Sequence, residues 1–432
     1  MRLSVIGTGY LGATHAASMA ELGHKVVGVD IDPIKINRLA AGHVPFYEPG
    51  LPELLSKHVA SGALRFTTSI QTAAAFADLH FVCVGTPQKQ GEYAADLTFV
   101  DAAFLALRDW VRPGAVVVGK STVPVGTATR LAALLRDAGV ELVWNPEFLR
   151  EGFAVEDTLR PDRIVIGATD DAARELLEAA YAPILAAGTP VVRTDFATAE
   201  LVKVAANAFL ATKISFINAV AEVCEVAGAD VTQLAEAIGH DERIGHKFLR
   251  AGLGFGGGCL PKDIRAFMAR ADELGIDQAV SFLKNIDEIN LRCRARMVDL
   301  AREMCEGSLA GRRVGVLGAA FKPDSDDIRD SPALDVAYAI QRAGAAVRVY
   351  DPEAMHNAKD AFPTLTYVPS ALEACQAADV VLHMTEWEEF RALRPADLAP
   401  IVRERNMLDG RNVLDPDQWR AAGWQFRAPG RS

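Results

Sequence analysis

The sequence lacks the features that mark several broad classes of protein. Its six cysteines never stand at CxxC spacing, so the chain resembles neither a disulfide framework nor a cysteine zinc site. It has no Lys/Arg-rich run, and 45 basic against 56 acidic residues give a net charge of −11. Nucleic acid and anionic membrane surfaces are therefore poor partners. The apolar runs fall short of the roughly 18 residues that predict a membrane span.

What is present is ordinary globular chemistry. Half of the 432 residues are apolar, 23% are charged and 7% are aromatic, which suits several buried cores and about three domains. Met1 leads directly into a strand-like run, so we expect no signal peptide and a soluble, cytoplasmic protein. We expect no metal, and any anionic ligand must be held by a local basic pocket.

Short apolar runs alternate with helical patterns in the first 170 residues. This alternation predicts a parallel, doubly wound sheet with helices on both faces. The predicted strands are residues 3–6, 25–30, 79–84, 115–120, 141–144 and 163–167.

The pattern recurs near the C-terminus, which predicts an internal repeat of the fold. Runs at 313–317, 346–350 and 379–383 follow the order of the first three N-terminal runs, but the second glycine turn lacks GxGxxG spacing. The second copy is therefore not expected to bind a dinucleotide in the same way. Long helical patterns at 199–227 and 277–306 lie between the copies, and such helices often form a dimer face.

The predicted fold class is α/β, with two Rossmann-like domains joined by a long central helical region. The expected domains are residues 1–195 for dinucleotide binding, 196–306 for the central helical and dimerisation domain, and 307–432 for the second Rossmann-like domain.

A glycine turn follows the first predicted strand. Gly7, Gly9 and Gly12 have GxGxxG spacing before a helical pattern, and Asp30 ends the next strand. The glycines allow a pyrophosphate to approach the backbone at a helix N-terminus, and the carboxylate can bond a ribose hydroxyl. A carboxylate there would repel a 2′-phosphate, so NAD is favoured over NADP. The alternative is a purely structural glycine turn, and Tyr10 suits packing better than chemistry.

The segment 254–263, GFGGGCLPKD, is the most unusual stretch. Four glycines in five residues suit a backbone that passes closely around a ligand. Pro261 suits a first helical turn, which places Cys259 at a helix N-terminus that favours the thiolate. The alternative is a helix-entry loop with an inert, buried cysteine. The other five cysteines lie in apolar patterns and are interpreted as packing.

Two further pairs are candidates for a polar site. Lys203 and Asn207 lie four residues apart in an apolar helical pattern, and hence on one helix face; a lone lysine there would otherwise be a solvated surface residue. Glu147 and Glu151 follow a strand end, where open α/β sheets bind ligands. Their alternative role is that of ordinary acids at a helix start.

These motifs together resemble the UDP-glucose 6-dehydrogenase family within the nucleotide-sugar dehydrogenases. The matching motifs run nearly end to end along the chain. They are GTGYLG (7–12), YEPGL (47–51), VGTP (84–87), KSTVPVGT (120–127), NPEFLREG (145–152), DRIVIG (162–167), ELVKVAANAFLATKISFIN (200–218), RIGHKFL (243–249), GFGGGCLPKD (254–263), FKPDSDDIRDSP (321–332) and DGRN (409–412).

The resemblance implies two successive hydride transfers from C6 of one sugar to two NAD⁺. Cys259 would capture the aldehyde as a thiohemiacetal and then become a thioester. Lys203 and Asn207 would stabilise oxyanions and place the water, and Asp263 and Glu147 would act as acid and base. Thr122 would help to hold that water near the nicotinamide.

The resemblance also implies two sets of binding residues and a homodimer, with Arg243 reaching across it. The cofactor set is Gly7, Gly9, Tyr10, Leu11, Gly12, Asp30, Lys35, Thr86, Thr122, Glu151 and Arg329. The sugar-nucleotide set is Glu147, Phe148, Leu149, Lys203, Asn207, Arg243, Arg250, Phe255, Gly256, Phe321, Lys322 and Arg411, together with the 252–257 backbone.

Two features depart from the commoner family pattern: the stretch Ala13-Thr-His-Ala16, and Gly258 where serine is frequent. Neither removes a residue with an assigned role, but both bear on the preferred sugar or base. Related enzymes oxidise TDP-glucose, UDP-N-acetylmannosamine, UDP-N-acetylglucosamine or GDP-mannose.

Two other hypotheses concern the function itself. One is a two-electron hydroxy-acid dehydrogenase, which would not need Cys259. The other is a catalytically silent dinucleotide-sensing or scaffold protein, which predicts that some of the catalytic residues are replaced.

Overall fold

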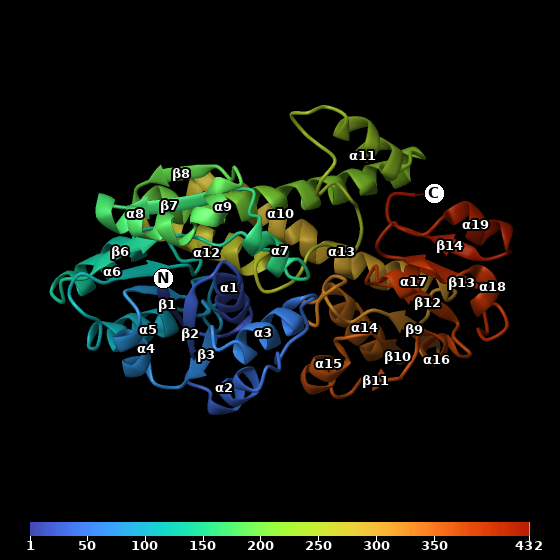
Figure 1. Ribbon diagram of the computed structural model, residues 1–432. Coiled ribbons are helices and arrows are strands. Elements are labelled where there is room, and N and C mark those ends of the chain that lie inside the picture. The colour runs from blue at the N-terminus through green and yellow to red at the C-terminus, as the bar shows by residue number, and fades with distance from the viewer. Residues whose placement is uncertain (432) are drawn as a thin grey trace. The chain divides into compact units, whose positions relative to one another are not determined.

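The computed structural model describes residues 1–431, and its contacts group them into two compact units (Figure 1). Unit 1 comprises Met1–Ala206 with Ala269–Gly275, and unit 2 comprises Asn207–Met268 with the chain from Ile276 onward. Two helices, α10 (Phe196–Ala227) and α12 (Leu260–Glu273), run from one unit into the other.

Unit 1 is built on an eight-stranded sheet in the order β3-β2-β1-β4-β5-β6-β7-β8. All neighbours are parallel except β6 and β7, which pair antiparallel; the expected parallel sheet is thus confirmed up to that pair. The strands are β1 (Arg2–Ile6), β2 (Lys25–Val29), β3 (Leu64–Thr67), β4 (Leu79–Val82), β5 (Val116–Gly119), β6 (Glu141–Trp144), β7 (Ile164–Ala168) and β8 (Val191–Thr194).

Helices cover both faces of this sheet because its strands are apolar on both sides. In β5, Val116 and Val118 join one buried cluster, whereas Val117 between them joins the other. The first cluster takes residues from α1 (Tyr10–Glu21), α2 (Pro33–Ala40), α3 (Leu51–Ala60), α7 (Ala154–Leu159), α8 (Asp171–Ala180) and α9 (Ala182–Ala186). The second takes them from α4 (Ile70–Phe76), α5 (Thr98–Arg108), α6 (Thr127–Arg136) and the start of α10.

Unit 2 contains a six-stranded parallel sheet in the order β11-β10-β9-β12-β13-β14. This order matches that of the first six strands of unit 1, so the predicted fold repeat is confirmed. The strands are β9 (Arg313–Leu317), β10 (Ala346–Tyr350), β11 (Thr366–Tyr367), β12 (Val380–His383), β13 (Asn406–Asp409) and β14 (Gln425–Arg427). Its helices are α14 (Pro332–Arg342), α15 (Met355–Ala361), α16 (Ala371–Cys375), α17 (Glu388–Arg391), α18 (Pro395–Leu398) and α19 (Pro416–Ala421).

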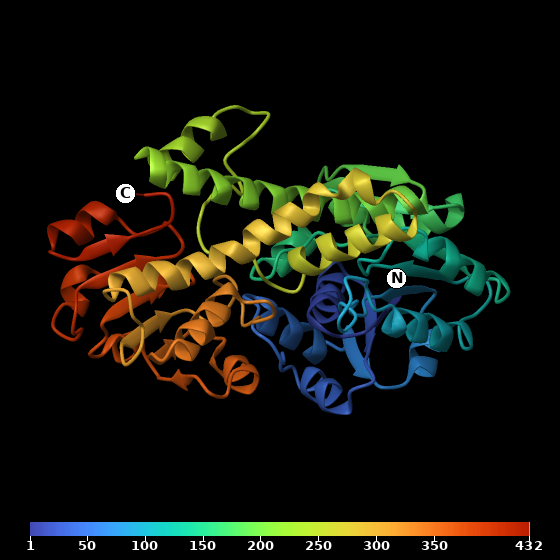
Figure 2. The ribbon, with the colours of Figure 1, turned by 180° about the vertical axis from the view of Figure 1, so that it is seen from behind.

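Long helices make up the rest of unit 2. They are most of α10, then α11 (Val231–Gly239), the first part of α12, and α13 (Phe282–Met304) after a short 3₁₀ turn, η1 (Asp277–Val280). Figure 2 shows α13 beside the unit 2 part of α10, where Ser215 Oγ donates to the Ile286 carbonyl at 2.8 Å. Both predicted long helices are therefore present.

By length and composition α10 resembles a membrane span. It is 32 residues long, with a mean hydropathy of 1.4 in its most apolar window, 44% of which is buried. A core helix of a soluble protein has the same properties. Buried Glu200, Lys203 and Asn207 lie on this helix, so its apolar character is weak evidence for a membrane.

Candidate active site

The glycine turn of unit 1 has the geometry of a phosphate-binding turn. It links β1 directly to α1, whose first residue is Tyr10. A Cβ on Gly12 would lie 1.8 Å from the Gly7 carbonyl oxygen, so only glycine lets the helix pack this closely on the turn. A Cβ on Gly9 would meet nothing within 4 Å, which leaves open space beside the first N–H groups of α1. A pyrophosphate fits such a place.

Asp30 ends β2 beside this turn. Its carboxylate accepts hydrogen bonds from the Thr8 backbone N–H at 2.9 Å and from Lys35 Nζ at 2.9 Å. Burial raises the pKa of Asp30, but these bonds and that from the Asp32 N–H outweigh burial and hold the pKa below its ordinary value. An anionic carboxylate at this position suits a ribose diol and repels a 2′-phosphate.

Asp351, which corresponds to Asp30 in the C-terminal repeat of the fold, is buried and fully hydrogen-bonded within the protein. Asp351 follows β10 and accepts hydrogen bonds from the Ala319 and Ala320 N–H groups at 2.7 and 3.0 Å. The Trp387 indole also donates to it at 3.1 Å, and Asp351 is fully buried. No helix follows this second turn until α14 begins at Pro332. Both features argue against a dinucleotide site in the repeat.

Tyr10 anchors the start of α1 rather than presenting a free hydroxyl. Its hydroxyl donates to the Glu48 carboxylate in a short contact and accepts from the Gly152 N–H at 3.0 Å. Glu48 also accepts from the Gly152 and Ala154 N–H groups, each at 2.7 Å. The YEPGL segment thus ties the glycine turn to the loop that carries Glu151. Leu11 packs against the core cluster beside it.

Glu147 is held by a buried lysine. Lys120, which follows β5 and is 3% exposed, lies 3.1 Å from the Glu147 carboxylate. Its ammonium also donates to Asn145 Oδ1 at 2.9 Å and to the Tyr181 hydroxyl at 3.3 Å. Burial raises the pKa of Glu147, but Lys120 and the Phe148 N–H overcome this effect, so its pKa is lowered and the group is a carboxylate.

Lys203 lies near the same carboxylate. Its charge contributes to lowering the pKa of Glu147, and its Nζ lies 5.3 Å from the centroid of the Phe148 ring. The Arg163 guanidinium packs on this ring at 3.9 Å. The Leu149 N–H donates to Glu147 Oε1 at 3.1 Å. Unit 1 thus brings together Glu147, Phe148, Leu149 and Lys203, four of the residues expected to bind the sugar nucleotide.

Thr86 and Thr122 meet at the carboxyl ends of β4 and β5. Thr86 Oγ1 donates to the Thr122 carbonyl at 2.8 Å, and Ser121 Oγ donates to the Val84 carbonyl at 2.7 Å. These bonds join two neighbouring strand ends at the sheet edge where parallel α/β sheets bind ligands.

Cys259 directly precedes α12 and is exposed. One turn into the helix, the Asp263 N–H donates to the Cys259 carbonyl at 3.0 Å. The Asp263 side chain is 2% exposed and accepts from Asn207 Nδ2 at 2.6 Å and from Lys262 Nζ at 2.5 Å. The acid of the 254–263 motif and the amide of the 200–218 motif therefore meet within unit 2, one helical turn from Cys259. The other five cysteines are buried.

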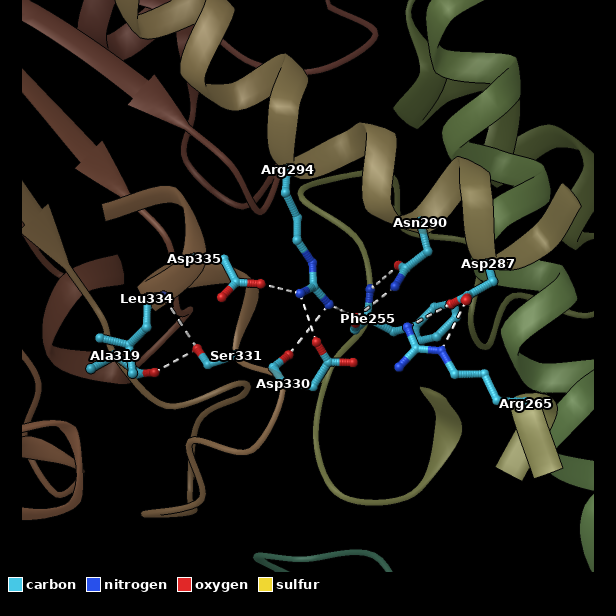
Figure 3. Close-up of polar contacts among 10 residues, drawn as sticks. All are labelled: Phe255, Arg265, Asp287, Asn290, Arg294, Ala319, Asp330, Ser331, Leu334 and Asp335. Carbon is cyan, nitrogen blue, oxygen red and sulfur yellow. Dashed lines mark hydrogen bonds and ion pairs between the residues drawn. The ribbon is translucent and has the colours of Figure 1, made fainter. Parts of the chain in front are cut away.

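The glycine loop before Cys259 is fastened to α13, as Figure 3 shows. Asn290 accepts from the Phe255 N–H at 2.7 Å and donates to the Phe255 carbonyl at 2.9 Å. Arg294 donates to the Phe255 carbonyl at 3.2 Å and pairs with Asp330 at 2.7 Å and with Asp335 in a shorter contact. One buried arginine thus joins the glycine loop to the 330–335 segment.

Close approach explains the glycines of this loop. A Cβ on Gly256 would lie 2.2 Å from the Asp330 carbonyl oxygen, and one on Gly257 would lie 2.8 Å from the Phe321 ring. A Cβ on Gly258 would lie 2.3 Å from the Arg329 guanidinium carbon. The absence of serine at 258 therefore leaves space that Arg329 occupies.

The proposed sugar-nucleotide residues of the repeat form a second group. Arg411 donates to the carbonyls of Met384 at 2.6 Å and Phe321 at 2.7 Å. Arg411 and Arg250 both pair with Glu386, at 3.2 and 3.7 Å. Lys322 Nζ lies 5.9 Å from the Phe321 ring centroid.

Arg243 is different. Its guanidinium is on an exposed loop, and its hydrogen bonds within residues 1–431 all go to Asp241 of that loop.

His15, in the stretch that departs from the family pattern, belongs to the core. It is fully buried and packs edge-on against Phe81, with ring centroids 4.5 Å apart. Burial lowers its pKa well below the ordinary value, so the ring is neutral. The departure at His15 therefore lies in the packing of the core.

Several residues that support the site were not predicted from the sequence. Lys120 and Asn145 stand directly after strands, a position that could have marked them. Glu48 lies inside a motif used only for the resemblance. Asn290 and Arg294 are harder to recognise in the sequence than Lys120 or Asn145. Their only mark is that they are polar residues on the buried face of the long helix α13.

A dinucleotide turn in one parallel sheet, and a cysteine at a helix start beside a buried acid, define an NAD-dependent dehydrogenase with a candidate cysteine nucleophile. The chain belongs to the UDP-glucose/GDP-mannose dehydrogenase family. Its NAD binding domain matches residues 1–185, its central domain 197–292 and its UDP binding domain 315–416. The chain is therefore an oxidoreductase that uses NAD.

Relatives and solved structures agree with this assignment. The chain is 43% identical to UDP-glucose 6-dehydrogenase of Rhizobium meliloti (strain 1021), over 100% of both chains. It is 40% identical to UDP-glucose 6-dehydrogenase TuaD of Bacillus subtilis (strain 168), covering 100% of this chain and 93% of that one. It is similar to a UDP-glucose dehydrogenase structure from Pyrobaculum islandicum, with TM-score 0.91, 39% identity and coverage of 100% and 98%.

Proposed function

We propose that this protein oxidises UDP-glucose at C6 to UDP-glucuronate with two NAD⁺. The observation that carries the proposal is the placement of Cys259 at the start of α12, with the buried Asp263 carboxylate one turn on and bonded to Asn207. A simple two-electron alcohol dehydrogenase has no use for a nucleophilic thiol.

The cofactor is held by the glycine turn and Asp30, with Lys35, Thr86, Thr122, Glu151 and Arg329 as further contacts. When bound, NAD⁺ would supply the hydride acceptor for each oxidation. The open space at Gly9 and the anionic Asp30 fit this group, as described above.

The residues of this chain divide the chemistry between them. The Cys259 thiolate adds to the aldehyde carbon left by the first oxidation, forming a C–S bond and a thiohemiacetal. Loss of the second hydride from that carbon leaves a thioester. Water then breaks the C–S bond and releases a carboxylate and the thiol. Overall one alcohol, two NAD⁺ and one water yield one carboxylate, two NADH and three protons.

The residues around Cys259 have supporting roles that follow from their charge and polarity. Lys203 and Asn207 stabilise the oxyanions that develop on the substrate carbon. Glu147, kept anionic by Lys120, and the buried Asp263 receive and return protons during hydrolysis. Thr122 helps to hold the attacking water.

The sugar nucleotide is bound by Arg250, Phe255, Gly256, Phe321, Lys322 and Arg411, with Arg243 contributed across a homodimer. Three domains, at 1–195, 196–306 and 307–432, and a soluble, cytoplasmic location complete the proposal. Arg243, Arg250 and Arg411 all lie in unit 2. Guanidinium groups suit the binding of a diphosphate by a chain that is acidic overall.

A substrate panel tests the assignment. Initial rates of NADH formation would be compared for UDP-glucose, TDP-glucose, UDP-N-acetylmannosamine, UDP-N-acetylglucosamine and GDP-mannose at equal concentration. We expect the highest kcat/KM for UDP-glucose. A higher value for any other sugar nucleotide would replace UDP-glucose as the substrate and leave the oxidation chemistry in place.

A further inference from the structure

Three potential metal ligands meet at the end of α11, in a part of unit 2 whose only proposed role so far is that of Arg243 in substrate binding. His240 Nε2 lies 3.4 Å from Glu236 Oε1, and His246 Nδ1 lies 3.5 Å from Glu236 Oε2. The three ligand atoms all lie within 4.8 Å of one another, and the three residues are exposed. Figure 1 shows α11 and the loop that follows it.

These distances suit a tetrahedral ion. Bonds of about 2.0–2.1 Å to imidazole nitrogen and carboxylate oxygen place neighbouring ligands about 3.4 Å apart in a tetrahedron. Each imidazole nitrogen already has this spacing to one oxygen of the Glu236 carboxylate, His240 to Oε1 and His246 to Oε2. Two imidazoles with one carboxylate select Zn²⁺ and similar transition metals, whereas Mg²⁺ and Ca²⁺ prefer oxygen ligands alone.

The backbone presents these ligands together. Glu236 and His240 are one helical turn apart, so their side chains share a face. A Cβ on Gly239 would lie 2.3 Å from His246 Nδ1, so glycine at 239 admits the imidazole against the helix end. Lys213 Nζ donates to the carbonyls of Ile244 at 2.8 Å and Gly245 at 3.2 Å, which fastens the loop just before His246.

The local charge also favours a cation. Residues 230–247 carry four acidic side chains and two basic ones. The imidazole rings are 4.9 Å apart and perpendicular, so both can direct a nitrogen toward one ion.

We propose that Glu236, His240 and His246 bind one divalent transition-metal ion, Zn²⁺ in the first instance, with water completing the coordination. The ion clips residues 241–245 against the end of α11. This site departs from the expectation of no metal, which was based on cysteine spacing. We further infer that this clip orients Arg243 for the substrate, and this part of the inference rests on the proposed function. Metal binding at the site is independent of that function.

Calorimetric titration of the metal-free, full-length protein with ZnCl₂ tests the site. The exposed thiol of Cys259 is a competing ligand, so all proteins carry Cys259→Ser. We expect one Zn²⁺ per chain. His246→Ala and Glu236→Gln should each weaken binding at least about tenfold, since loss of even supporting groups around a metal costs that much. Equal affinity in His246→Ala, or no binding by the parent, would overturn the proposal.

His356→Ala is the matched control. His356 and Asp360 form another exposed histidine–carboxylate pair one turn apart, at 4.0 Å, and are not part of any three-ligand group among residues 1–431. Zn²⁺ affinity should therefore be unchanged in this variant. A loss equal to that of His246→Ala would show non-specific binding to surface histidines and would reject the site.

Limited trypsin digestion tests the clip without substrate. The Arg243 side chain is 89% exposed, and Zn²⁺ should slow cleavage after it in the Cys259→Ser protein but not in the same protein with His246→Ala. Cleavage after Lys89, whose side chain is 49% exposed in a loop of unit 1, is the internal reference. Unchanged cleavage at Arg243 with Zn²⁺ bound would reject the clip.

Discussion

Lys120 Nζ lies 3.1 Å from the Glu147 carboxylate, with the lysine side chain 3% exposed. Burial alone would raise the pKa of Glu147, and the neighbouring ammonium reverses that direction. In the proposed mechanism this carboxylate accepts protons near neutral pH, and the buried ammonium keeps it charged. In that proposed mechanism Lys120 thus acts on the reaction through Glu147.

Lys120→Met should lower kcat at neutral pH on the order of 10²-fold, the size of one general acid–base contribution. Without the cation, burial raises the pKa of Glu147, so the acidic limb of the kcat–pH profile should move to higher pH. The profile, measured from pH 5 to 9, checks the direction. An unshifted limb with reduced kcat would contradict the proposed link.

The matched control for this change is Lys57→Met. Lys57 pairs with Glu21 at 2.7 Å, but its side chain is 59% exposed, where an ion pair contributes about 0–1 kcal/mol. Neither the profile nor the stability should change. Removing Lys120 from its buried pair should cost about 3–5 kcal/mol of unfolding free energy, so profiles are measured on protein shown to be folded by circular dichroism.

Asn290→Ala should slow turnover while leaving NAD affinity intact. The substitution leaves the Phe255 N–H and carbonyl without their amide partner, at a cost of about 1–3 kcal/mol, and loosens the loop before Cys259. NADH formation and NAD⁺ binding would be measured separately. Gln278→Ala is the control, since the Gln278 amide bonds only to the neighbouring Asp277 in the described chain. A parallel loss of NAD⁺ binding would indicate general unfolding.

Asp30 and Asp351 allow one substitution to be compared in two copies of the fold. Asp30→Asn should weaken NAD⁺ about 10–100-fold, the value of a charge-assisted bond of about 1.5–3 kcal/mol, and should reduce discrimination against NADP⁺. Asp351→Asn should lower the melting temperature and leave both cofactor affinities unchanged, because Trp387 seals that carboxylate. Fluorescence titration with each dinucleotide checks both expectations.

Much of the fold was predictable because its strands are apolar on both faces. Runs such as 115–120 and 346–350 stand out from their helical surroundings, and the order of the repeat could be read from them. Five strands were missed: β3, β8, β11, β13 and β14. β3, β8, β11 and β14 are short or polar and lie at sheet edges. β13 lies inside its sheet, but its four residues include only two apolar ones, Met407 and Leu408. The antiparallel pairing of β6 and β7 leaves no mark on the apolar pattern.

The parts of the candidate site that lie within a single sequence motif could be predicted from the sequence. The glycine turn with Asp30, and the 254–263 loop with Cys259, depend on local spacing that a sequence shows. Asn290 and Arg294 act through tertiary contacts with Phe255 and Asp330, residues 35 and 36 positions away. Such partners are set by how α13 packs, which residue spacing does not reveal.

The most direct test of the account is the number of NADH molecules formed per UDP-glucose. Limiting sugar nucleotide would be converted with excess NAD⁺ by the parent protein, by Cys259→Ser and by Cys375→Ala, a control in which a buried thiol with a pKa raised to about 12 is removed. The account predicts two NADH per sugar for the parent and the Cys375 variant, and loss of turnover in Cys259→Ser. One NADH per sugar from the parent, or two from Cys259→Ser at the parent rate, would contradict the thioester mechanism.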